Sequence, residues 1–76
     1  RSDPDDRFLL EANQQLVRTL RAWLEADAVI EAAARVLGVH RHTVRARIGL
    51  AERLLQRDLG GFAARADVWA ALVATR

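Results

Sequence analysis

Arginine and histidine side chains gather in one short stretch of the chain, directly after the glycine at position 38. The stretch from Arg41 to Arg53 carries four arginines and one histidine. Arginine presents a planar fork of N–H donors that binds phosphate, or the edge of guanine, through two bonds at once. Histidine can donate to or accept from a base edge. These residue types predict contacts with a polyanion such as duplex DNA, and not bond-making chemistry.

The distribution of charge supports this interpretation more strongly than the net charge of +2. Residues 1–31 hold four Arg against seven Asp and Glu, a local charge of about −3. Residues 35–57 hold six Arg against the single Glu52, a local charge of about +5, and residues 58–76 are balanced. A local field of this kind attracts a polyanion to the middle of the chain.

The residues around Gly38 have the spacing of two helices joined by a tight turn. Ala34 lies four residues before the glycine, where two helices must approach closely and little more than a methyl group fits. Gly38 can adopt the positive φ that ends a helix at little cost. Val39 should point inward from the turn, and His40 occupies the expected N-cap of the next helix. This is the pattern of a helix-turn-helix, whose second helix is offered to the DNA major groove.

The second of these helices has one side for the core and one for a ligand, at ~100° per residue. Its predicted buried stripe consists of Val44, Ile48, Ala51 and Leu55. Its opposite side carries His42, Ala46, Gly49 and Arg53, with Arg41 and Arg45 along one flank. Leu50 and Leu54 form a second apolar strip that needs another neighbour, either the last helix or a partner subunit. Arg47 lies on the other flank, nearer the buried edge.

Each predicted DNA contact has an assigned role. We expect Arg41 and Arg45 to reach phosphates or guanine edges, and His42 and Ala46 to lie nearest the bases. Arg35 and Arg53 add to the electrostatic attraction. Two residues keep two interpretations each. Thr43 either bonds a phosphate or closes the first turn of its helix, and Arg47 either contacts phosphate or pairs with an acidic residue of the scaffold.

The scaffold that must hold this helix is small and all-α. Seventy-six residues make one domain, and we divide them into a linker over residues 1–6 and a helix-turn-helix domain over residues 7–76. Asp5 or Asp6 is the expected N-cap of a helix over 7–25. One continuous helix from 7 to 37 would be about 45 Å long, so a break near Asp27 is required, with Asp27 as the next N-cap.

The remaining helices are predicted over 28–37, 41–57 and 62–74, which makes a small bundle of four to five helices. The first helix should bury one stripe, made of Leu9, Ala12, Leu16, Leu20 and Trp23, and turn Arg18, Arg21 and Glu25 to water. The last helix should bury the stripe of Phe62, Ala66, Trp69 and Val73, with Leu72 beside it. All four aromatic residues, Phe8, Trp23, Phe62 and Trp69, are assigned to the core and not to base stacking.

Other classes of function find little support. The chain has no cysteine, no apolar run near the ~20 residues of a membrane span, and an acidic start unlike a signal peptide. His40 and His42 lie two apart on one element and point in different directions, so we expect no metal and no cofactor. No nucleophile, paired carboxylate or phosphate loop can be argued, and we expect no enzyme. A cytoplasmic location fits, and because residue 1 is not Met we expect a fragment of a longer protein.

At Ala34 to Ile48 the chain resembles a known family, the PucR/CdaR regulators of purine and sugar-diacid catabolism. The C-terminal helix-turn-helix of that family has the approximate pattern A-x-x-L-x-V-H-R-N-T-L-x-Y-R-L. The positions identical to it are Ala34, Leu37, Val39, His40, Arg41, Thr43 and Arg47. The resemblance extends outward, to Leu16–Leu24 on one side and to Asp58–Leu59 and Arg65–Leu72 on the other. His42 stands in place of the usual Asn and Ala46 in place of the usual Tyr, so the base preference of relatives cannot be transferred.

The resemblance implies a bacterial transcriptional regulator that binds double-stranded DNA, often as a homodimer, with a separate N-terminal sensor domain in the same chain. The competing hypothesis is a protein-interaction or dimerisation module on the same scaffold, with Leu50 and Leu54 as its surface.

Overall fold

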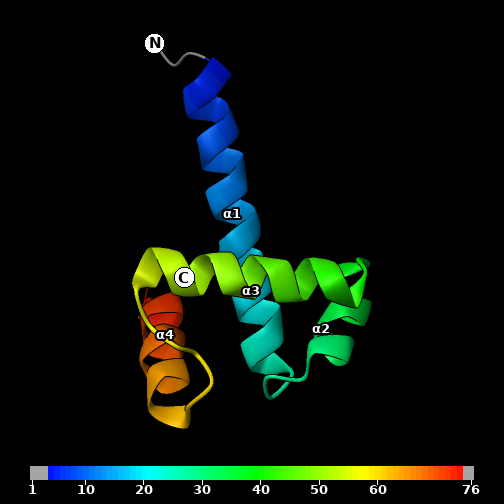
Figure 1. Cartoon of the computed structure of the whole chain (residues 1–76), viewed down its shortest axis with the longest axis vertical. Coiled ribbons are helices and arrows are strands. Elements are labelled where there is room, and N and C mark those ends of the chain that lie inside the picture. The colour runs from blue at the N-terminus through cyan, green and yellow to red at the C-terminus, as the bar shows by residue number, and fades with distance from the viewer. Residues whose placement is uncertain (1–3, 75–76) are drawn as a thin grey trace.

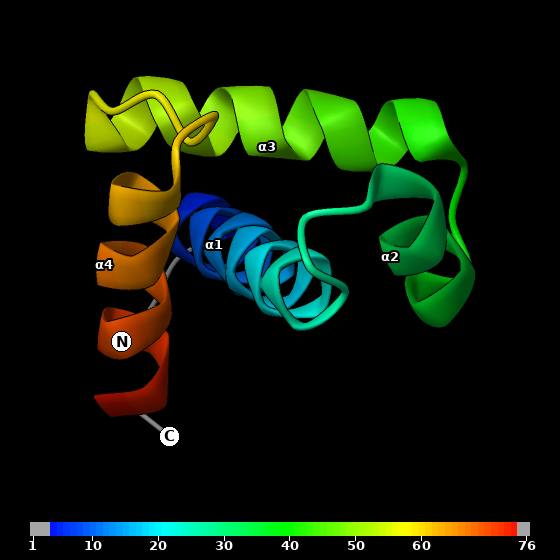
Figure 2. The same cartoon turned by 90° about the horizontal axis from the view of Figure 1, so that it is seen from below.

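Four α-helices make up the part of the chain that the structure describes (Figure 1). This computed structural model describes the backbone of residues 4–74 and the side chains of residues 10–74. The helices are α1 (Pro4–Glu25), α2 (Ile30–Leu37), α3 (Arg41–Leu55) and α4 (Phe62–Ala74). α3 crosses α1, and α2 and α4 lie on the two sides of the C-terminal half of α1 (Figure 2). The predicted all-α bundle is confirmed.

α1 begins earlier than the sequence predicted. Its first residue is Pro4, and proline suits the first helical position because its fixed φ is helical and the N–H it lacks would have no partner there. Asp5 and Asp6 therefore lie inside the first turn and are not N-caps. Of the predicted linker, only residues 1–3 precede the helix, and they lie outside the described residues, as do the side chains of Phe8 and Leu9. The first half of α1 projects past α3 (Figure 1).

The predicted break between α1 and α2 is confirmed, but Asp27 has the opposite role from the one expected. Asp27 and Ala28 both have left-handed backbone, with φ of 58° and 63°. The Ala28 N–H donates to Trp23 O (2.8 Å) and the Asp27 N–H to Leu24 O (3.1 Å), the pair of bonds that closes a helix C-terminus. Asp27 thus ends α1, and the N-cap of α2 is Val29, without a side-chain cap.

The turn between α2 and α3 follows the sequence prediction. Gly38 has φ of 71°, and its N–H and that of Val39 both donate to Ala34 O, at 2.9 and 3.1 Å. Ala33 and Ala34 are buried, which lets α2 pack closely in the bundle. Val39 is half-buried and packs against the core, as expected of a residue that points inward from the turn.

The core is formed where α1 crosses α3. Leu20 and Trp23 of α1 belong to the same buried cluster as Val44 and Ile48 of α3. Val44 is 0% exposed, and it is surrounded by side chains from the other helices. Thr19 is the buried polar residue of this region. The predicted stripes of α1 and α3 are thus confirmed at these positions, because the crossing buries one side of each helix.

The end of α3 departs from the predicted stripe. Leu55 is 47% exposed, although its spacing places it on the buried side. The helix ends at Leu55, and Gln56 turns left-handed at φ of 54°. Leu59 is buried, at 1% exposed, and joins the core. The loop that carries it is fixed by its own N–H, which donates to Glu52 Oε2 at 2.7 Å.

α4 buries a different side from the one predicted. Its buried residues are Ala64 and Leu72, and Val68 between them packs against the core. Phe62 is 82% exposed and Val73 is 43% exposed, so the predicted face is wrong at these two positions and Phe62 is not a core residue. Trp69 packs against the core as predicted. Apolar residues occur all around this helix, so their spacing could not identify the inward side.

Arg21 is also misplaced by the sequence prediction. It was expected to face water, but it is half-buried between α1 and α4, where its Nη2 donates to Leu72 O at 3.5 Å. Trp69 is half-buried as well.

In the described part of the chain, no helix has both the length and the apolar character that crossing a bilayer demands.

Candidate nucleic-acid interface

One side of α3 is uncovered along its length. In Figure 2, α1, α2 and α4 all lie on the same side of α3, and in Figure 1 α3 lies in front of α1. Its inward side consists of Val44, Ile48 and Ala51, which are all buried. An α-helix supported from one side only is what entry into a major groove requires.

The N-terminus of α3 is closed by histidine. His40 has extended backbone, and the His42 N–H donates to His40 Nδ1 at 3.1 Å, so the predicted N-cap is confirmed. This bond requires an unprotonated Nδ1. The two imidazole rings stack, with centroids 4.8 Å apart and planes 27° from parallel. His40 is exposed.

The predicted site residues fall into two groups by exposure. Those that are exposed are Arg35, Arg41, His42, Arg45, Ala46 and Arg53. Those that are half-buried are Thr43 and Arg47. Arg35 lies in the last turn of α2 and the others on α3. The structure therefore brings most of the predicted side chains to the uncovered side of one helix and its flanks.

Arg47 has a partner that neither sequence interpretation included. Its Nη1 donates to Thr19 Oγ1 at 3.3 Å, and Thr19 is 1% exposed. The bond joins α3 to α1 at the point where the two helices cross. Arg47 is therefore bound to a hydroxyl of the scaffold and not to a carboxylate.

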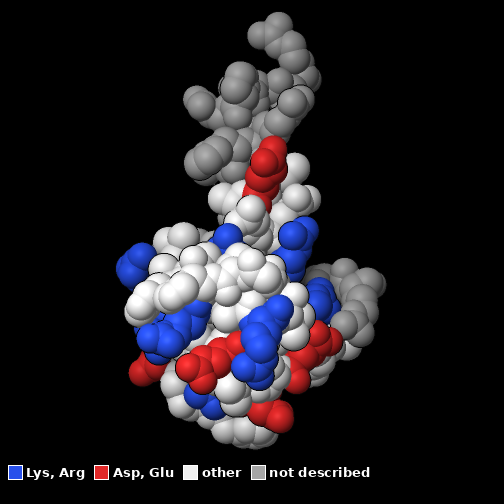
Figure 3. Space-filling model, turned by 90° about the vertical axis from the view of Figure 1, so that its right-hand side faces the viewer, with Lys and Arg blue, Asp and Glu red and all other residues white. Residues whose placement is uncertain are grey.

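Two arginines between residues 35 and 57 pair with carboxylates. Arg41 Nη1 lies 3.9 Å from Glu31 Oε2, with both side chains more than half exposed, and a pair this long and wet contributes little to stability. Arg57 Nη1 lies 2.9 Å from Asp67 Oδ2, which holds Arg57 against α4. On the face drawn in Figure 3, arginine and carboxylate side chains lie among one another, so the positive charge of that face comes from separate side chains and not from one unbroken patch.

The second apolar strip of α3 is exposed. Leu50 is 39% and Leu54 is 63% exposed, so α4 does not cover them and the strip has no neighbour among the described residues that buries it. Sequence reasoning proposed either the last helix or a partner subunit as that neighbour. The first of these is now excluded.

Sequence reasoning missed two polar residues that position α3. Thr19 supports Arg47, and the carboxylate of Glu52 holds the loop that brings Leu59 into the core. The signal for Thr19 was its helical spacing from the predicted stripe of α1, since it lies three residues after Leu16 and four before Trp23. Among the described residues there is no group of three or more His, Cys, Asp or Glu that could hold a metal ion.

In comparison with known proteins, one protein-family model matches most of the chain. The family model described as the PucR C-terminal helix-turn-helix domain matches residues 16–74. The match takes in the second part of α1 and all of α2, α3 and α4. No curated protein and no solved structure matches the chain.

Proposed function

Since the chain belongs to the PucR C-terminal helix-turn-helix family, whose fold is that of DNA-binding transcription regulators, we propose that it binds duplex DNA sequence-specifically, with α3 in the major groove. The observation that carries this proposal is the uncovered side of α3. His42, Arg45 and Ala46 lie there on consecutive turns, and all are exposed.

The two kinds of contact fall to different residues. Arg45 and Arg53 on α3, with Arg35 on α2, provide positive charge for phosphates. Arg41 does so as well, because its long contact with Glu31 is easily exchanged for a phosphate. His42 and Ala46 lie nearest the base edges, where a short side chain lets the helix sit deep.

Thr43 and Arg47 occupy the flank of the interface. Thr43 is the third residue of α3 and half-buried, within reach of a phosphate beside the groove. Arg47 donates to Thr19 through one nitrogen, and a guanidinium has further N–H groups for a phosphate. Arg47 would then fix the angle at which α3 meets the duplex.

A single domain of this size binds DNA weakly and with steep salt dependence. We therefore infer that the functional unit is a homodimer that reads two half-sites one or more helical turns apart. An N-terminal sensor domain of the same chain would supply the signal, in a cytoplasmic regulator without enzymatic activity of its own in this domain.

The decisive experiment measures the salt dependence of DNA binding for the wild type and for Arg45→Ala. If Arg45 binds a phosphate, its removal weakens binding to all sequences and flattens the slope of log K against log salt by about 1. An unchanged slope would exclude the phosphate role. Arg18→Ala serves as the control, because Arg18 is an exposed arginine of α1.

Base reading by His42 is tested by binding-site selection with wild type and His42→Asn. We expect a changed sequence preference with little change in overall affinity, because asparagine favours adenine through two bonds. The same selected motif for both proteins would remove His42 from the base-reading set.

The second candidate function is protein docking through the leucine strip, since Leu50 and Leu54 are exposed on α3. Titration with random duplex DNA at low and moderate salt separates the two functions. DNA binding requires association that weakens as salt rises, whereas a purely protein-binding domain associates little at either concentration.

A further inference from the structure

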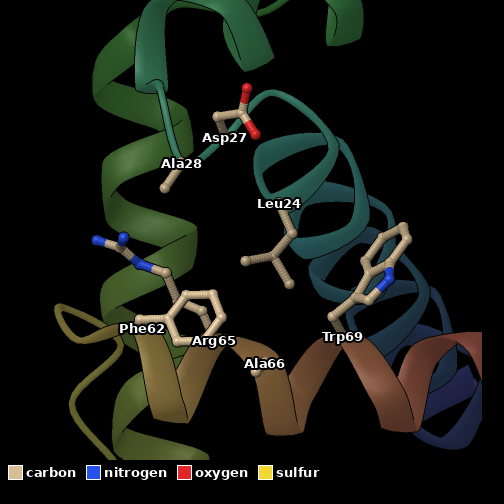
Figure 4. A pocket seen from close by; sticks show the side chains of 7 residues that line it. All are labelled: Leu24, Asp27, Ala28, Phe62, Arg65, Ala66 and Trp69. Atoms are coloured by element: carbon tan, nitrogen blue, oxygen red, sulfur yellow. The ribbon is translucent and has the colours of Figure 1, made fainter.

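An open cleft of about 380 Å³ lies between the end of α1, the α1–α2 turn and the first two turns of α4 (Figure 4). Its walls are mainly apolar, from Leu24, Ala28, Phe62, Ala66 and Trp69, and two charged residues, Asp27 and Arg65, complete the lining. No residue of α3 lines it. A molecule bound in this cleft would therefore leave the uncovered side of α3 free.

Phe62 is the reason to expect an occupant. It is 82% exposed, more than any other large apolar residue in the described part of the chain. Its phenyl ring stands at one side of the cleft, facing the open space that Leu24 and Trp69 border from the other side (Figure 4). An exposed aromatic ring beside an apolar hollow is the typical anchor of a protein interface.

The two charges of the cleft do not satisfy each other within one copy. Among the described residues, the ion pairs are Glu31 with Arg41 and Arg57 with Asp67. Arg65 donates from Nε to Leu59 O at 2.8 Å, and its guanidinium carbon lies 5.4 Å from the centroid of the Trp23 ring. These contacts fix the Arg65 side chain through Nε and the face of its guanidinium. Its two terminal nitrogens can still form an ion pair with a carboxylate.

A surface with one cation and one anion beside an apolar hollow can complement itself. In a two-fold arrangement each residue i of one copy meets residue j of the other, and j meets i. Asp27 of one copy would then face Arg65 of the second, and the reverse, while each Phe62 covers the hollow of the other.

We propose that a second copy of this chain occupies the cleft, and that the Phe62 cleft is the interface of the homodimer. The need for two copies rests on the proposed function, in which a dimer binds two half-sites. Self-association through the cleft is measurable without DNA, so the two ideas can fail separately.

The position of the chain's other end favours a second copy over a preceding segment of the same chain. The cleft lies at the Glu25 end of α1, and the chain enters α1 at Pro4, at the far end of the helix (Figure 1). The 22 residues of α1 separate these points by about 33 Å at 1.5 Å per residue. A segment preceding Pro4 would have to return over the whole length of α1 to reach the cleft.

The test compares Phe62→Asp with two matched controls by sedimentation equilibrium. All three sites are highly exposed, Val36 at 76%, Leu54 at 63% and Phe62 at 82%, so each aspartate leaves the fold intact, as circular dichroism would verify. We expect Phe62→Asp to raise the dimer dissociation constant about tenfold or more. Val36→Asp and Leu54→Asp should leave it unchanged.

Several outcomes would overturn the proposal. A wild-type chain that stays monomeric in solution and binds two half-sites without cooperativity has no such interface. Equal weakening by Phe62→Asp and Val36→Asp would reduce the effect to general surface charge. Weakening by Leu54→Asp alone would transfer the interface to the leucine strip.

The proposed contact between Asp27 of one copy and Arg65 of the other gives an independent test. Asp27→Arg places arginine opposite arginine and should weaken the dimer more than Asp27→Asn, which only removes a charge. The difference should shrink at high salt, and equal dimerisation by the two variants would contradict the arrangement.

On DNA, Phe62→Asp should keep single-site affinity and lose cooperativity on two half-sites. A dimer that depends on Phe62 but binds no DNA would refute the proposed function and leave the interface standing.

Discussion

The two sides of α3 are built from different residues and have different neighbours. The inward side presents Val44, Ile48 and Ala51, none more than 7% exposed, to α1 and α2. The outward side carries Arg45, Ala46 and other polar or small residues with no helix over them. A single turn of helix, from Val44 to Arg47, thus contains a core residue, two outward residues and a tether to α1.

This difference teaches that stability and binding can be altered separately in one helix. A change on the inward side should act on the free energy of unfolding, since burial of apolar surface supplies most of it. A change on the outward side should act on the free energy of DNA binding, since Arg45 and Ala46 are exposed and not part of the core. Residues on the border, such as Arg47, should affect both.

Val44→Asp is expected to have the largest effect. It would put a carboxylate without a partner at a site that is 0% exposed, which costs several kcal/mol. A domain of this length has only about 4–11 kcal/mol of stability, at ~0.05–0.15 kcal/mol per residue. We expect the loss of a cooperative thermal transition followed by circular dichroism. A folded Val44→Asp with an ordinary melting curve would show that the inward side is not the core.

Ala46→Asp places the same charge two residues later, on the outward side. The fold should remain, with a stability loss below about 1 kcal/mol from helix propensity. The affinity for duplex DNA should fall about 10- to 100-fold, because a carboxylate would face phosphates. Ala46→Gln controls for side-chain size without charge. If Ala46→Asp bound DNA as well as Ala46→Gln, the outward side would not be the interface.

Arg47→Ala tests the border between the two sides. Loss of the donor to Thr19 leaves a hydroxyl that is 1% exposed without this partner, which should cost about 1–2 kcal/mol of unfolding free energy. Adding Thr19→Val should recover part of that loss, so urea unfolding of the two single variants and the double variant gives a coupling energy. Strictly additive effects would mean that the bond contributes nothing.

The smallest expected effects come from the turns that precede α2 and α3. Gly38→Ala should destabilise the domain by about 1 kcal/mol, because φ is 71° there and a Cβ meets nothing within 4 Å, so only the backbone conformation is strained. Ala28→Gly, at φ of 63°, should stabilise by about 0.5–1 kcal/mol for the same reason. Shifts of equal sign in the midpoint of denaturation would contradict this account.

Periodicity predicted the fold well where a helix has one apolar side. The α3 stripe, the Gly38 turn and the break between α1 and α2 follow from spacing, helix length and the cost of positive φ. The face of α4 was wrong because Phe62, Ala66 and Val73 form as good a stripe as Ala64, Val68 and Leu72. Only the position of α4 against α1 decides between these stripes, and that position is a tertiary fact.

The location of the candidate site could be predicted from the sequence, but the hydrogen bonds that hold its side chains to the rest of the domain could not. Charge and motif placed the candidate site on α3 before the fold was known, and the role of its arginines in DNA binding stays a prediction. The partner of Arg47 was not predictable, because a hydroxyl on α1, 28 residues earlier in the chain, has no signature in local spacing. The reversed role of Asp27 was missed because Asp serves both as an N-cap and, less often, in left-handed backbone.

α1 has a mechanical consequence. It is one unbroken helix from Pro4 to Glu25, which projects past α3 toward its Pro4 end (Figure 1) and is held in its second half by the core and by the Thr19–Arg47 bond. A twist or tilt applied at the Pro4 end would not be absorbed by a hinge, since the described helix contains none. It would reach Arg47 of α3, the helix that we propose enters the major groove. A domain attached ahead of Pro4 could therefore change the orientation of α3 through α1 without contacting α3.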